Sequence, residues 1–136
     1  MLKLFSITML TVAFAIAAFA AKRFPLAAAS IVPAAKGSVE IGHDRNGNTE
    51  IKLTVEHLAN PTSLSPSQAN YVVWLQDKTS GPENRGELRV NGKLEGIFQT
   101  VTPRNRKNFD LFVTGENDGT AKSPSGLEVL RTTVSR

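Results

Sequence analysis

The sequence predicts an all-β domain, an immunoglobulin-like antiparallel β-sandwich of roughly seven strands, behind an apolar amino-terminal signal or anchor helix. Polar and apolar residues alternate in several short runs after residue 37, and Gly, Pro, Asn and Ser clusters separate these runs. No stretch after residue 36 has the spacing of an amphipathic helix. Strand counting does not distinguish two packed sheets from one closed sheet, so a barrel remains the alternative.

Residues 1–20 are expected to form a signal peptide. Lys3 precedes an uncharged run over residues 4–21, and Ala18-Phe19-Ala20 has the small-x-small pattern of a cleavage site. A run of 18 residues is near the lower limit for spanning a bilayer, so an uncleaved anchor and a buried apolar helix are the alternatives. The sequence therefore predicts an extracytoplasmic protein, periplasmic or secreted, with membrane contact only through an uncleaved amino-terminal segment.

Residues 21–36 hold two prolines and many alanines without a clean period, which predicts a linker with at most a short first strand before the domain at 37–136. Residues 38–41 and 49–58 are expected to form a hairpin across the turn-rich stretch 43–48, where Asn46-Gly47 favours positive φ. His57 follows the inward-facing residues of the second strand in phase and is expected to cap the core.

Five further segments are predicted to be strands. Residues 71–75 (YVVWL) have the composition of a strand buried on both faces, and 87–90 and 93–101 are expected to pair across Asn91-Gly92. Residues 109–114 and 127–134 complete the set. The residues expected in the core are Ile51, Leu53, Val55, Tyr71, Val73, Trp74, Leu75, Phe109, Leu111 and Val113.

Composition excludes several kinds of chemistry. The chain has 136 residues and no cysteine, which rules out disulfides, thiolate metal sites and a cysteine nucleophile. It has two histidines without metal-ligand spacing, and no nucleophile-elbow or phosphate-loop motif. Asp44, Asn46 and Asn48 match the start of a calcium loop but lack its glycine and its final carboxylate, so a turn is favoured. We expect no enzyme and no cofactor; a small hydrolase with paired acids is the least favoured class.

Candidate binding residues are few. Arg104, Arg106 and Lys107 form a small basic cluster beside Phe109, which is expected to be a solvated loop or to contact anionic envelope polymers or lipid headgroups. Trp74 is a second candidate for a binding surface, although a core position suits it better. The net charge of +4 arises from 16 basic and 12 acidic residues, a mixture that does not predict nucleic-acid binding.

The order of several segments resembles the extracytoplasmic carboxyl-terminal domain of anti-sigma-K-type (RskA-like) factors of bacteria. The matching pieces are His57-Leu58, the Y-x-x-W-L run at 71–75, Gly86-Glu87-Leu88, the V-T-x-E run ending at Glu116, Pro124-Ser125-Gly126 and Val129-Leu130. The resemblance covers roughly residues 38–134 and implies a β-sandwich outside the membrane, without catalytic residues. The family's cytoplasmic sigma-binding domain has no counterpart in this sequence, so that activity does not carry over.

The expected function is therefore an exported, non-catalytic binding or sensory module with a protein or envelope partner. The alternative is a structural subunit that assembles by β-strand augmentation, through an edge strand or through a free arm at residues 27–35. Both the binding module and the structural subunit are compatible with a homo-oligomer.

Overall fold

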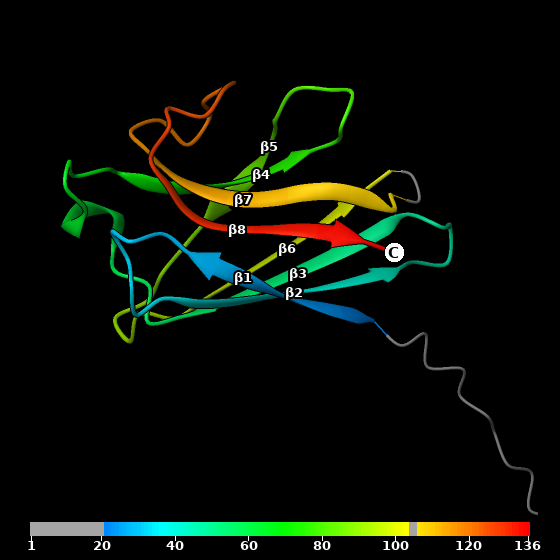
Figure 1. Cartoon of the computed structure of the whole chain (residues 1–136), viewed down its shortest axis with the longest axis horizontal. Helices are drawn as coiled ribbons and strands as arrows, with labels where there is room; N and C mark the ends of the chain where they lie inside the picture. Colours follow the sequence, from blue (N-terminus) through cyan, green and yellow to red (C-terminus); the bar gives the residue numbers. More distant parts are fainter. Residues whose placement is uncertain (1–20, 104–105) are drawn as a thin grey trace, which may run out of the picture.

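A computed structural model describes residues 21–103 and 106–136, which form an all-β antiparallel fold (Figure 1). The expected amino-terminal helix falls on residues 1–20, outside the described residues. The elements are β1 (Lys22–Ala28), β2 (Lys36–His43), β3 (Thr49–Glu56), the short 3-10 helix η1 (Pro61–Ser63), β4 (Asn70–Gln76), β5 (Glu83–Leu88), β6 (Gly96–Thr102), β7 (Asn108–Glu116) and β8 (Glu128–Ser135).

Hydrogen bonds connect the eight strands of the described chain into one sheet, in the order β5-β4-β7-β8-β1-β2-β3-β6. β1 holds the sheet together, because residues 22–26 pair with β2 whereas Ala27 and Ala28 pair with β8. In Figure 1, β4, β7 and β8 lie on one side of the fold, and β1, β2 and β3 lie on the other. The prediction of an antiparallel all-β fold is confirmed. The sheet curls into a nearly closed barrel, so the immunoglobulin-like sandwich of two separate sheets is not confirmed.

The core fills the inside of this curled sheet. On β3, Ile51, Leu53 and Val55 are at most 2% exposed and alternate with polar residues that face solvent. Alternation of this kind follows from the two-residue period of a strand. All ten residues expected in the core are buried. Trp74 differs from the other nine because it belongs to a second, smaller cluster with Val72 and Phe112.

The segment 21–36 is not the expected linker. Seven of its residues form β1, and Leu26, Val32 and Ala35 are buried in the main core. Ala27 pairs with Arg131 and Ala28 with Leu130, so residues 27–35 are not a free arm that could pair with a neighbour. The proposed route to assembly through this arm is therefore wrong.

The hairpin across Asp44–Asn48 is present as expected, but His57 does not cap the core. The φ of His57 is +54°, which interrupts the alternation of β3 and leaves the imidazole exposed. Leu58 takes the inward position instead, with 0% exposure, and its N–H donates to the carbonyl of Leu94. A positive φ at a residue other than glycine is uncommon, which is why the period alone misplaced His57.

The predicted hairpin across Asn91-Gly92 is wrong, because β5 pairs with β4 and β6 pairs with β3 at opposite ends of the sheet order. The Asn91 side chain instead accepts hydrogen bonds from the N–H groups of Lys93 and Glu95 and folds a wider loop. Asparagine commonly stabilises turns in this way. The loop carries the chain across the seam between β5 and β6.

β5 and β6 approach each other along a seam that has no backbone ladder in the part of the chain described. At one end, a β-carbon on Gly96 would lie 2.5 Å from the carbonyl oxygen of Arg89. At the other end, the Arg85 guanidinium donates to the Thr100 hydroxyl at 3.2 Å and to the Val101 carbonyl at 3.1 Å. Side chains rather than strand pairing therefore close the barrel.

Gly96→Ala is expected to destabilise the fold by about 1–3 kcal/mol, because the added methyl group meets backbone that has little freedom to move. Gly42 is a matched control, since it also lies in a strand and a β-carbon there would have no atom within 4 Å. Urea unfolding of both alanine variants measures the difference. Equal stability of the two variants would mean that β5 and β6 do not meet as closely as described.

Candidate binding surface

The outer face of β6 carries an exposed stripe, defined here as the β6 stripe: Ile97, Gln99 and Val101. Ile97 is 63% exposed and Val101 is 48% exposed, and only Ile31 among the other large apolar residues described is similarly open. Period-two geometry places these three side chains outward while Phe98 and Thr102 point inward. Ile97 and Val101 stand four residues apart, about 13 Å along the strand, with the Gln99 side chain between them.

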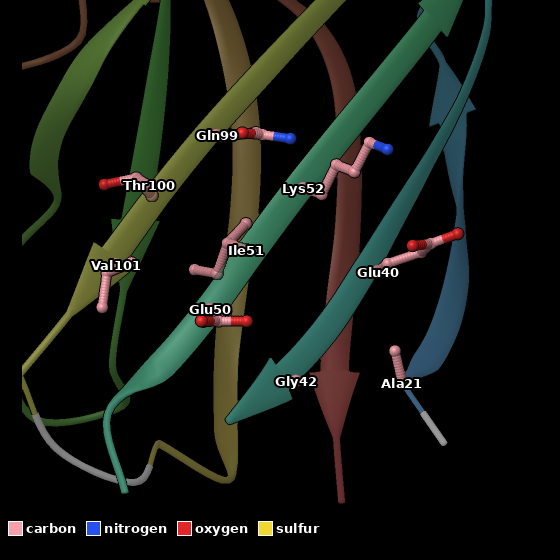
Figure 2. Close-up of a pocket in the computed structure, with 9 residues that line it drawn as sticks. All are labelled: Ala21, Glu40, Gly42, Glu50, Ile51, Lys52, Gln99, Thr100 and Val101. Atoms are coloured by element: carbon pink, nitrogen blue, oxygen red, sulfur yellow. The ribbon is translucent and has the colours of Figure 1, made fainter. Parts of the chain in front are cut away.

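A shallow groove of about 530 Å³ lies beside one end of the β6 stripe (Figure 2). Small residues make the hollow, because Gly42 has no side chain and Ala21 has only a methyl group. Figure 2 shows Glu40, Lys52 and Gln99 standing on neighbouring strands along this face. The pairing register places Glu40 opposite Lys52 and Lys52 opposite Gln99.

A second hollow, of about 380 Å³, flanks the other end of the stripe. Its lining includes Ile97, Thr54 and Glu56, together with Arg89 and Glu95 from the adjacent loop. The β6 stripe thus runs between two open hollows on the same face of the sheet. Small-molecule sites are usually concave enough to bury most of their ligand. Two open hollows, one at each end of the β6 stripe, suit an extended polypeptide better.

The charges on this face are mixed. Glu40 forms an ion pair with Arg23 across β1 and β2, whereas Glu50 and Lys52 are exposed on β3. Exposed pairs of this kind contribute little to stability, about 0–1 kcal/mol, so their main effect is on which partner is attracted and in which orientation.

The predicted basic cluster is not a free cationic surface. Arg104 lies outside the described residues, and Lys107 is exposed. The Arg106 side chain is only 10% exposed and binds both carboxylate oxygens of Glu83, at 3.1 and 3.2 Å. Asp77 lies 3.7 Å away on its other side. Arg106 therefore connects the loop before β7 to the residues that follow β4. The basic run in the sequence does not predict this structural role, because both acidic partners come from a distant segment.

Trp74 is not on the surface either. Its side chain has 0% exposure and stacks on Phe112 with ring centroids 6.4 Å apart. The indole N–H donates to the Thr114 hydroxyl at 2.8 Å, which in turn donates to the carboxylate of Glu116 at 2.7 Å. These residues stand on the outer side of β4 and β7, away from the main core.

The segment between β7 and β8 covers this aromatic pair. Ala121 packs against the cluster, and the Asn84 side chain donates to the carbonyls of Gly119 and Ala121, both at 2.9 Å. Near the end of the segment, the Ser125 N–H donates to the Glu116 carboxylate. Glu116 is only 3% exposed, so this buried carboxylate fastens the loop to the sheet.

Tyr71, the only tyrosine in the chain, is buried and donates its hydroxyl to the carbonyl of Ala59 at 2.5 Å. Burial disfavours the phenolate and raises the pKa of Tyr71 to about 12. Ultraviolet titration of the folded protein is expected to show a midpoint near pH 12. Because the folded-state pKa exceeds the unfolded value near 10, the stabilisation is full below pH 10 and is lost as the pH rises through 12. A midpoint near 10 in protein that is still folded would contradict this burial.

Asp44 stabilises the hairpin turn. Its carboxylate accepts hydrogen bonds from the Asn48 side chain and from the N–H groups of Asn48 and Asn46. These bonds, led by that from the Asn48 side chain, lower the pKa of Asp44. Over residues 21–103 and 106–136, no three His, Cys, Asp or Glu side chains come together as a metal site. The arrangement is the turn that the sequence favours over a calcium loop.

Comparison with known proteins found no protein-family model, no curated protein and no solved structure that matches the chain. No helix within the described part of the chain is long and apolar enough to cross a membrane.

Sequence reasoning missed the β6 stripe, although its signal was present. Residues 96–102 (GIFQTVT) place apolar side chains on both faces of the strand, Ile97 and Val101 on one and Phe98 on the other. The pattern does not say which face is covered. Ile97 and Val101 are exposed because they lie on the outer face of the curled sheet.

Proposed function

We propose that this protein is an exported, non-catalytic binding module that engages a polypeptide partner through the outer face of β3 and β6. The observation that carries the proposal is the exposed apolar pair, Ile97 and Val101, set between two open hollows on one sheet face. The apolar side chains supply the contact area, and Glu50 and Lys52 beside them orient the partner.

The proposal that the protein is exported rests on the uncharged run over residues 4–21 and the small-x-small pattern at Ala18-Phe19-Ala20. The resemblance to the outer domain of anti-sigma factors supports a sensory function at the bacterial envelope. Mass spectrometry of separated cell fractions tests export. A mature chain that begins near Ala21 in the exported fraction, or an intact chain in the membrane fraction, agrees with it. An intact chain that is soluble in the cytoplasm contradicts it.

Photo-crosslinking in the host cell tests the binding surface. A photoreactive phenylalanine analogue replaces Gln99 in the β6 stripe, with the same replacement at exposed Lys122 as the matched control. Position 99 is expected to give discrete crosslinked protein bands that position 122 does not give. If both positions give the same bands or if position 99 gives none, the β6 stripe is not the binding surface.

A structural subunit is the second candidate function, and one observation favours it. β6 ends the sheet order, so the edge opposite β3 is not paired in a ladder within the described residues. Such an edge is the usual template for strand addition once the Arg85 side chain, which bonds Thr100 and Val101 along it, moves aside. With residues 27–35 held in the fold, an edge strand is the remaining route for this kind of assembly.

A further inference from the structure

The barrel end at which β1 begins brings together segments that are distant in the sequence. The Arg106 N–H donates to the Thr49 hydroxyl at 2.9 Å, and the Arg136 N–H donates to the Lys107 carbonyl at 3.1 Å. The Arg136 guanidinium lies 3.1 Å from the imidazole of His43. In Figure 1, β1 begins and β2 and β8 end on this same side of the fold. The hairpin between β2 and β3, the loop before β7 and the end of β8 therefore form one surface.

Basic residues predominate at this end and acidic residues at the other. The strand ends and connections at this end contain six basic and four acidic side chains, over residues 21–23, 43–50, 76–83 and 106–108. The opposite end contains four basic and six acidic side chains, over residues 28–36, 56–69, 87–96 and 116–128. The charge of the folded chain is therefore uneven along the barrel axis, and the first end is called the cationic end below.

Three cations of the cationic end are available to a partner. Lys22 lies at the start of β1, Arg45 in the hairpin between β2 and β3, and Lys107 in the loop before β7. All three side chains are exposed, and over residues 21–103 and 106–136 none of them forms an ion pair.

The four acids of the cationic end compensate these cations only in part. Asp77 and Glu83 face the Arg106 guanidinium and are neutralised there. Asp44 accepts the hydrogen bonds of the hairpin turn, and Glu50 is exposed. The charges that this end presents to solvent are therefore mainly positive.

The apolar run of the sequence joins the barrel at the cationic end. Residues 4–21 carry no charge, and Ala21, the last of them, is exposed and lines the groove beside Val101. Val101 is itself 48% exposed. Basic residues that follow directly after an apolar segment are attracted to anionic lipid headgroups. An anionic membrane surface fits both the charge of this end and the point where the apolar run enters it, whereas a soluble polyanion fits the charge alone.

We propose that the cationic end docks on an anionic lipid surface, with Lys22, Arg45 and Lys107 toward the headgroups. Each basic residue close to such a surface strengthens binding about fivefold. The attraction decays within a Debye length, about 10 Å at 0.1 M salt. In this orientation the β6 stripe stands on the side of the barrel and stays open to a polypeptide. The docking goes beyond the binding function proposed above and does not depend on it.

Energy transfer to labelled lipid headgroups tests the docking in protein purified from the host. Asn46→Cys, in the hairpin, and Ser30→Cys, at the opposite end, each give one site for a donor fluorophore, because the chain has no cysteine of its own. With vesicles of phosphatidylcholine and phosphatidylglycerol in equal amounts, transfer from position 46 should exceed transfer from position 30. The excess should fall when phosphatidylglycerol is omitted or salt is raised. A tether through the apolar run acts in both lipid mixtures, so the dependence on lipid charge identifies docking.

Charge reversal identifies the residues. Lys22→Glu, Arg45→Glu and Lys107→Glu, combined, should abolish the part of the transfer that depends on phosphatidylglycerol. The matched control has the same net charge and reverses three exposed lysines at the opposite end, where it should leave that transfer unchanged: Lys36→Glu, Lys93→Glu and Lys122→Glu.

Equal transfer in the two lipid mixtures, or equal losses in the two triple variants, would overturn the proposal. Binding of soluble polyphosphate without any transfer that depends on phosphatidylglycerol would assign the cationic end to a soluble polyanion and would also overturn it. The crosslinks expected from position 99 test the polypeptide partner separately, so failure of the docking and failure of the binding function are distinguishable.

Discussion

Trp74→Ala is expected to lower the free energy of unfolding by about 3–5 kcal/mol, the largest effect of any single change considered. The indole is completely buried against Phe112, and the Arg131 guanidinium lies over the other aromatic ring at 4.3 Å from its centroid. Removing the indole leaves a cavity beneath the loop between β7 and β8 and removes the donor to Thr114. Urea or thermal unfolding measures the loss.

Trp74→Phe is an intermediate variant. It keeps an aromatic ring on Phe112 but removes the indole N–H and one of the two fused rings, so the expected loss is smaller than for alanine: about 1 kcal/mol for the hydrogen bond plus the cost of a smaller cavity. If Trp74→Ala cost no more than Trp74→Phe, the aromatic cluster would not be packed as described.

Glu116→Ala is expected to cost about 2–4 kcal/mol, because it removes the acceptor for the Ser125 N–H and for the Thr114 hydroxyl. The loop between β7 and β8 should loosen, which hydrogen exchange at the Ser125 amide would detect as faster exchange. Asp118→Ala is the matched control in the same loop. The Asp118 carboxylate is exposed and accepts hydrogen bonds from the side chain and the N–H of Thr120, which lower its pKa.

The control variant should cost less than about 1 kcal/mol, as exposed local bonds usually do. Equal losses for the two variants, with unchanged exchange at Ser125, would show that Glu116 does not fasten the loop.

The strands that follow a clean two-residue period could be predicted from the sequence. Ile51, Leu53 and Val55 show why, since one buried face and one solvated face leave an unambiguous alternation. The run at 71–75 was also recognisable, because β4 is buried on both faces. These local patterns predict that a segment is a strand, and the prediction does not depend on which other strands it pairs with.

The pairing of strands could not be predicted in the same way. β1 contains Pro25 among alanines and changes partner from β2 to β8 just after it, a combination that has no local period. The turn residues Asn91-Gly92 indicated a hairpin, but β5 and β6 find different partners. Turn chemistry fixes the local path of the chain, whereas non-local burial decides which strands meet.

The exposed residues of the candidate surface could not be predicted from local sequence either. Arg106 belongs to a basic run in the sequence, yet Glu83 and Asp77 arrive from another loop and neutralise it. Ile97 and Val101 look like core residues in the sequence, and they are exposed because the curled sheet places their face of β6 outward.

Residue-resolved hydrogen exchange along β6 tests the central claim, that this strand presents an unpaired edge with alternating free amides. In dilute protein, the amides of Ile97, Gln99 and Val101 should exchange rapidly, while those of Phe98, Thr100 and Thr102 are protected by their bonds to β3. Equal protection of all six amides would mean that a backbone ladder joins β6 to β5, which would contradict the sheet order described.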